Sequence, residues 1–154
     1  VAAIDDQGVV ACQGGNMSGW SMWLDGGRPR FTYNCFGHDV TTVTGPVLAS
    51  GSHLVEALFD YDGGFGQGGE LVLVVDESAV AHARLERTVP IVLSISGETF
   101  DVGTDTGSPV GPYPSDFVCS ANIVGVTLAR LDEPGDAVRA AELEGLFRAG
   151  LSTQ

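Results

Sequence analysis

The sequence predicts an all-β protein, an antiparallel jelly-roll-like β-sandwich, with one short α-helix near its C-terminal end. Short alternating or continuous apolar stretches recur along most of the chain, and glycine, proline and aspartate separate them. The intervals between these stretches are too short for the helices that connect parallel strands. We therefore expect a sandwich domain over residues 1–131, and a hinge followed by an amphipathic helix over residues 132–154.

The stretch GWSMWLDGGRPRFTYNCF is the clearest hairpin in the sequence. Its two halves alternate in character, and Gly26 and Gly27 between them permit a tight turn. Because successive side chains of a strand point to opposite faces, Trp20 and Trp23 must lie on opposite sides of the sheet. One of the two is expected in the core, which leaves at most one for a ligand.

Further strands are expected along the rest of the sandwich region, roughly nine or ten in all. The stretches that predict them are HLVEALFDYD, ELVLVVD, AVAHARLE, PIVLSI, TFDVGTD and NIVGVTLARL. The tail differs, because AVRAAELEGLFRAGL places its apolar residues near helical spacing and Asp136 precedes it as a suitable N-cap.

The glycine-rich stretch YDGGFGQGGELVLVV raises the possibility of a phosphate-binding loop, since Gly64, Gly66 and Gly69 fit G-x-G-x-x-G. A dinucleotide site needs a helix after the glycines, whereas the run that follows Gly69 is short and β-branched. The other phosphate loops need a lysine, and this sequence contains none. We therefore interpret the stretch as a hairpin loop.

Charge and cysteine usage limit the partners of the protein. A net charge of −13 argues against nucleic acid and anionic membranes, and no apolar run approaches the roughly 20 residues of a membrane span. The cysteines Cys12, Cys35 and Cys119 are odd in number and widely spaced, so we expect buried free thiols. Together with the lack of a signal-peptide pattern, they favour a cytoplasmic location.

Few residues are candidates for binding a ligand or a cation, and each of them also has a purely structural interpretation. Asp101 and Asp105 in ETFDVGTDTGSPV fit a calcium or sugar site at the rim of the sandwich. The other interpretation is a strand followed by turns, in which Asp105 and Thr106 bond local backbone N–H groups. Trp23 could offer a stacking face to a sugar, or belong to the core. The row Glu56, Asp60 and Asp62 fits a cation site or a solvated strand face.

Three stretches together resemble a known family. GVVACQGGNMSGWSMWLDGGRPRFTYNCFG is similar to a signature near the C-terminus of large bacterial arylsulfatases: a valine-rich strand, A-Q-G-G, G-W-S, a hairpin, then Y-x-Y-N and F-G. YDGGFGQGG resembles that family's Y-D-G-G-G-x-G-K-G-G loop, and ETFDVGTDTGSPV resembles its E-T-F-D-x-G-x-D-T-G-S-P-V segment. The stretches follow family order and span about residues 8–131.

The resemblance implies a C-terminal accessory domain with a concanavalin-like or laminin-G-like sandwich. The catalytic domain would lie upstream, with C-x-P-x-R or S-x-P-x-R and a divalent metal, expected to be calcium. Neither motif occurs in this chain, so no catalytic residue and no cofactor carries over. The loop around Gly66 and the 105–116 loop would be contact or rim elements, and Gln67 replaces a lysine that relatives often carry.

Two functions follow as expectations. The first is a non-catalytic domain of an arylsulfatase-like sulfuric ester hydrolase, packed on an upstream catalytic domain. The alternative is an autonomous carbohydrate-binding module, with or without the help of calcium. Whether the chain belongs to an enzyme thus depends on its parent protein. Trp23, Asp101, Asp105, Gly66 and Gln67 are the candidate ligand or contact residues, and a glycan is the expected partner of the alternative.

Deletion of residues 137–151 tests whether the predicted helix docks on the sandwich. Its apolar stripe includes Val138, Leu143 and Phe147, so the docked helix would cover apolar surface that its removal exposes. We expect the truncated chain to aggregate and to melt at a lower temperature. Unchanged solubility and unchanged thermal stability would contradict a docked helix.

Overall fold

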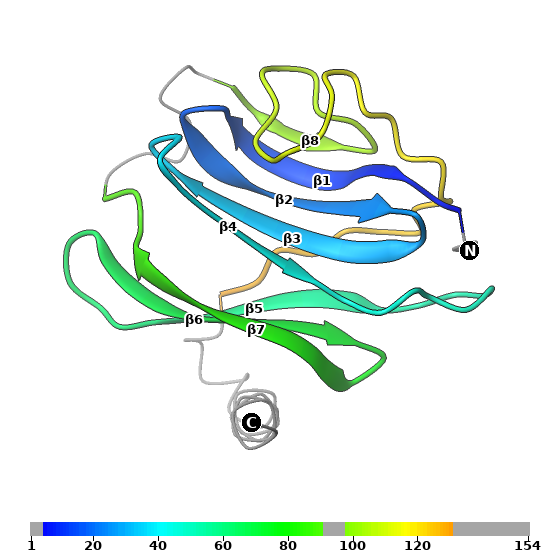
Figure 1. Ribbon diagram of the computed structural model, residues 1–154, viewed down its shortest axis with the longest axis horizontal. Helices are drawn as coiled ribbons and strands as arrows, with labels where there is room; N and C mark the ends of the chain where they lie inside the picture. The colour runs from blue at the N-terminus through cyan, green and yellow to red at the C-terminus, as the bar shows by residue number, and fades with distance from the viewer. Residues whose placement is uncertain (1–4, 91–97, 131–154) are drawn as a thin grey trace.

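The computed structural model describes residues 5–90 and 98–130 of the chain, and in these residues two antiparallel sheets face each other (Figure 1). One sheet has five strands in the order β4-β3-β2-β1-β8, and the other has three in the order β5-β6-β7. The all-β sandwich is thus confirmed. The predicted C-terminal helix lies outside the described residues.

The strand bounds follow the sequence pattern closely. The five-stranded sheet contains β1 (Gly8–Gly15), β2 (Ser18–Asp25), β3 (Arg28–Cys35), β4 (Asp39–Thr44) and β8 (Phe100–Val102). The three-stranded sheet contains β5 (Val55–Tyr61), β6 (Gln67–Val75) and β7 (Ser78–Arg87). The predicted tight hairpin is confirmed between β2 and β3, where Gly26 and Gly27 have φ of 54° and 68°.

One predicted strand is wrong within the described residues. Residues 122–130, most of NIVGVTLARL, belong to neither sheet. The apolar alternation that predicted a strand is present, but Val124 and Leu128 remain 87% and 64% exposed. Alternation of apolar and polar residues is a local pattern. A strand also needs a neighbouring strand with free backbone groups to pair with, and the local pattern does not show whether one is present. The predicted strand PIVLSI falls almost wholly on residues 91–97, outside the described part.

The core between the sheets is built on β6. Leu71 and Leu73 are fully buried and pack against Val43, Leu85 and the side chains of β2 and β3. Truncating a leucine at such a site costs about 2–5 kcal/mol, so these two side chains are a large part of the stability of the fold. Val72 and Val74 point to the other face of β6 and are 2% and 0% exposed, so this strand is buried on both faces.

The turn between β6 and β7 is fixed by a side-chain cluster. Asp76 has φ of 47°, a left-handed conformation that is costly for a residue with a side chain. Its Oδ1 accepts a hydrogen bond from the Leu54 backbone N–H at 2.9 Å, and its Oδ2 lies 2.7 Å from His53 Nδ1. His53 Nε2 faces the Ala49 carbonyl oxygen at 2.8 Å. Since both partners of the imidazole are acceptors, the protonated ring fits best.

This pair predicts a pH-dependent contribution to stability. The hydrogen bond to Asp76, and after it the one to the Ala49 carbonyl, raise the pKa of His53. The hydrogen bond with His53, and after it the one from the Leu54 N–H, lower the pKa of Asp76. The His53 contribution is therefore complete below its unfolded pKa of about 6.5 and is lost as pH rises through the raised folded value. The Asp76 contribution is complete above its unfolded pKa of about 3.9 and is lost as pH falls through the lowered folded value.

We therefore expect His53→Gln to lower the melting temperature most between about pH 4 and pH 6.5, and progressively less at alkaline pH. Thermal denaturation of both proteins across this range is the measurement. His38→Gln, which leaves the pair intact, is the control. A deficit of His53→Gln that is constant from acid to alkaline pH would contradict a charged pair.

Candidate functional site

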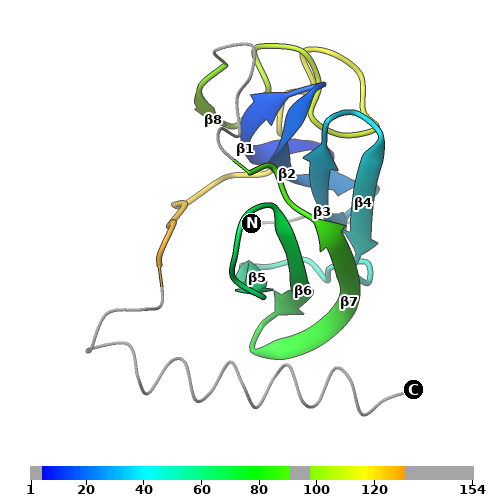
Figure 2. The ribbon, with the colours of Figure 1, turned by 90° about the vertical axis from the view of Figure 1, so that its left-hand side faces the viewer.

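The segment that follows β8 lies beside β8 and β1, on the side of the five-stranded sheet away from the three-stranded sheet (Figures 1 and 2). It also packs on Trp23 of β2. It is anchored at both ends. The Gly103 N–H donates to the Val10 carbonyl at 3.0 Å, and the Val9 N–H donates to the Phe117 carbonyl at 2.9 Å. We call residues 103–117 the covering loop. The five-stranded sheet is thus buried on two sides.

Trp23 lies beneath the covering loop and is only 3% exposed. Its ring packs against Tyr113 at 5.2 Å and Phe117 at 6.4 Å between centroids, with the Arg30 guanidinium 5.1 Å from its centroid. Its Nε1–H donates to Thr32 Oγ1 at 3.0 Å. The structure thus places this candidate sugar-stacking residue in the core, with its ring covered.

Trp20 points to the opposite face of β2, as the alternation predicts. It is half-buried and stacks on Phe31 at 6.0 Å with an interplanar angle of 12°, and Phe100 lies at 6.0 Å with a tilted ring. Of the two tryptophans, Trp20 is therefore the one that solvent reaches.

The two candidate aspartates hold the covering loop in place. Asp105, 2% exposed, accepts hydrogen bonds through Oδ2 from the Val110 N–H at 3.1 Å and the Tyr113 hydroxyl at 2.8 Å. Asp101 Oδ2 accepts from the Thr106 N–H at 2.9 Å and from Thr106 Oγ1 at 2.6 Å. The bond of Asp105 to the Val110 N–H agrees with the turn interpretation, whereas the bonds of Asp101 to Thr106 were not predicted.

Cys12 completes a cluster with these aspartates that sequence reasoning missed. It is the register partner of Asp101 across β1 and β8, and one ligand atom each from Cys12, Asp101 and Asp105 lies within 4.8 Å of the others. Burial, and then the Asp105 and Asp101 carboxylates, raise the pKa of the Cys12 thiol to about 12. The thiol is therefore neutral near pH 7, and its Sγ donates to the Thr104 carbonyl at 3.8 Å.

Gly66 and Gln67 lie far from this cluster, on the other sheet. Gly66 has φ of 65° and ends the loop between β5 and β6, and Gln67 begins β6 with an exposed side chain. Thr88 bonds to both residues, through its N–H to the Gly66 carbonyl and through its hydroxyl to the Gln67 carbonyl. The hairpin interpretation of the glycine stretch is confirmed, because a strand follows it.

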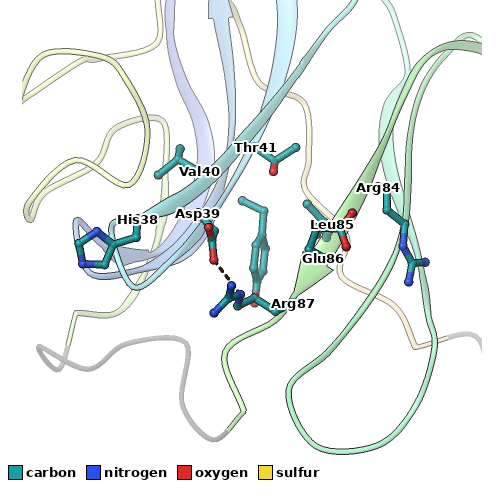
Figure 3. Close-up of a pocket in the computed structure, with 9 residues that line it drawn as sticks. His38, Asp39, Val40, Thr41, Arg84, Leu85, Glu86 and Arg87 are labelled. Atoms are coloured by element: carbon teal, nitrogen blue, oxygen red, sulfur yellow. Dashed lines mark ion pairs between the residues drawn. The ribbon is translucent and has the colours of Figure 1, made fainter.

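A surface pocket of about 270 Å³ opens where β4 and β7 approach each other (Figure 3). Its lining is mostly polar: Tyr33, His38, Asp39, Val40, Thr41, Arg84, Leu85, Glu86 and Arg87. Figure 3 shows Asp39 and Arg87 pointing toward each other across it, with Arg87 Nε 2.8 Å from Asp39 Oδ2. Arg84 lies to one side and pairs with Asp62 and Glu70.

The arginines of the pocket are paired. Arg87 faces Asp39 across it, and Arg84 pairs with Asp62 and Glu70 outside the lining. Tyr33 contributes an apolar ring, and its hydroxyl already accepts a hydrogen bond from the Val89 N–H at 3.0 Å. Sequence reasoning missed this site because β4 and β7 belong to different sheets and no motif connects them.

Comparisons with family models, with curated proteins and with solved structures give no match for this chain. Within the described residues no helix is long and apolar enough to cross a membrane. All three cysteines are free; Cys12 and Cys35 are buried as expected, and Cys119 is half-buried.

Proposed function

We propose that this chain is a non-catalytic sandwich domain of an arylsulfatase-like sulfuric ester hydrolase, and that it packs on a catalytic domain encoded upstream. The three resembling stretches support the family. The exposed apolar residues that follow the covering loop support the packing role, and they are the observation that carries this proposal.

Polar residues in the resembling stretches form hydrogen bonds that stabilise this domain, as expected of a non-catalytic packing domain. Asp101 and Asp105 of the third stretch hold the covering loop, as described above. In the same stretch, the Ser108 N–H and hydroxyl both donate to Glu98 Oε1, at 3.0 and 2.8 Å. In the first stretch, Asn34 Nδ2 donates to the Asn16 and Val110 carbonyls and so ties the β3 end to the loop. These polar groups are occupied within the domain.

The apolar row consists of Val118, Val124, Val126 and Leu128, and it lies between the covering loop and the end of the described residues. Their side chains are 64%, 87%, 37% and 64% exposed. Several exposed apolar side chains in one segment are typical of an interaction site. Figure 2 shows the segment running along the outside of the sandwich, past the three-stranded sheet. Phe65, in the separate loop between β5 and β6, is 72% exposed.

The first experiment is to sequence the coding DNA upstream of the Val1 codon. An open frame that encodes C-x-P-x-R or S-x-P-x-R several hundred residues earlier would establish the sulfatase parent. A start codon immediately before Val1 would overturn the proposal and leave a sandwich that works alone.

The contact is then tested by substitution in the apolar row. Val124→Asp with Leu128→Asp should weaken binding between this chain and a separately produced upstream domain by about tenfold or more, because the new charges would have to be buried. The melting temperature of the isolated chain should not change, since both side chains are exposed. Val40→Asp, at a valine that is 45% exposed on β4, is the control. Equal binding by all variants would contradict this contact.

The second candidate function is carbohydrate binding, and the pocket between β4 and β7 favours it. Asp39 and Arg87 offer planar polar groups to sugar hydroxyls, beside the Tyr33 ring.

Titration of the chain with a glycan panel, with and without calcium, tests the idea. Asp39→Asn should reduce binding by about tenfold or more, because each good hydrogen bond to a charged group contributes about 1.5–3 kcal/mol. Flat titrations of the wild type would remove this function. Trp23→Ala is unsuited to this purpose, because it removes a core side chain.

A further inference from the structure

The outer face of the three-stranded sheet, which points away from the five-stranded sheet, is buried at its centre. Val72 and Val74 of β6 lie on this face, and their exposed fractions are 2% and 0%. Their neighbours Leu58 on β5 and His82 on β7 are half-buried. Within the part of the chain that the structure describes, neither valine belongs to an apolar core cluster. We infer that a segment outside the described residues covers them.

Burial on the outer face is confined to one end of the sheet. Along β5, Leu58 is half-buried, whereas Asp60, which lies on the same face two residues later, is exposed. Along β7, His82 is half-buried, whereas Arg84 is exposed. The cover therefore lies over Val72 and the residues towards the turn between β6 and β7, and it stops short of the glycine-rich loop.

Two segments outside the described residues adjoin parts of the chain that are held at the other sheet. Asp6 accepts a hydrogen bond at 2.8 Å from the turn between β2 and β3, so the chain that follows residues 1–4 lies at the five-stranded sheet. Residues 91–97 connect Val89, whose N–H donates to the Tyr33 hydroxyl on β3, with β8 of the same sheet. Neither segment starts from the outer face of the three-stranded sheet.

The C-terminal segment begins beside the three-stranded sheet, because Figure 2 shows residues 122–130 running past that sheet. In the sequence of this segment, Leu143, Leu146 and Phe147 have the spacing of one apolar helix face. A helix over residues 137–151 is about 22 Å long at 1.5 Å per residue. The nine residues of β6 extend over about 30 Å, so such a helix fits along the sheet.

We propose that residues 137–151 form a helix that packs on the outer face of the three-stranded sheet, over Val72 and Val74. The helix makes a third layer of the fold, with Phe147 towards the sheet and Arg148 towards solvent. This places the helix that the sequence predicts on one named surface of the sandwich. It depends on neither the sulfatase proposal nor the carbohydrate proposal.

Hydrogen–deuterium exchange of the full chain, followed by mass spectrometry of peptides from residues 137–151, tests this contact from the side of the sheet. Leu58→Lys places a charge under the helix. We expect exchange in these peptides to become about tenfold faster or more, because burying the charge is costly and a helix of this length is marginal without packing. Val40→Lys, at a 45% exposed valine of β4, is the control and should leave the exchange slow.

Substitutions in the helix test the contact from its other side. Phe147→Asp should accelerate exchange by about tenfold or more and lower the melting temperature by about 4 °C or more. Arg148→Asp, which introduces the same residue about 100° further round the helix, should do neither. The combination of Leu58→Lys with Phe147→Asp should melt no lower than the less stable single variant, because both substitutions remove one contact.

Near-ultraviolet circular dichroism shows which variants are folded, and Leu58→Thr replaces Leu58→Lys if that variant does not fold. Three results would overturn the proposal. Fast exchange of residues 137–151 in the wild type would exclude a docked helix. Slow exchange that Leu58→Lys does not change would place the helix on another surface. Protection only at concentrations where sedimentation detects a dimer would assign the cover to a second copy of the chain.

Discussion

The constraint on which this structure depends is that the five-stranded sheet is apolar on both faces. One face packs on Leu71 and Leu73 of β6, and the other carries Val9 and Trp23. A second sheet covers the first face only, so an irregular segment must cover the second. Irregular backbone lacks a ladder to satisfy its polar groups, and buried side chains therefore have to do so. Asp105 has this role, since it accepts from Val110 and Tyr113 where the covering loop meets the sheet.

This constraint explains why candidate residues of apparent chemical interest have structural partners. Trp23 supplies the surface on which Tyr113 and Phe117 pack, and Asp101 holds Thr106 at the entrance to the loop. Among residues 5–90 and 98–130, two other features are accessible from outside and enter the proposals above. One is the polar pocket between β4 and β7, and the other is the exposed apolar row from Val118 to Leu128. The first is lined mostly by polar side chains, and the second consists of valine and leucine side chains.

The strands and the tight turn between β2 and β3 could be predicted because they rest on local rules. Alternation placed Trp20 and Trp23 on opposite faces, and Gly26 with Gly27 marked the turn. The strand predicted over 122–131 was wrong in its described residues because pairing is not local: Val124 and Leu128 have the pattern of a strand and find no edge there. Cys12 lies beside Asp101 because β8 pairs with β1. The residue spacing in the sequence does not indicate that these two strands pair.

The sequence by itself determined the all-β class, most strand bounds and the exclusion of a phosphate-binding loop, because side-chain alternation, glycine turns and the lack of lysine are properties of short stretches. Only the tertiary structure decided what each polar residue does. It buried Trp23 and Asp105 beneath the covering loop, brought Asp39 to Arg87 from different sheets, and placed Cys12 beside two carboxylates. The physical reason is that burial and charge pairing depend on which layers meet, and long-range packing settles that.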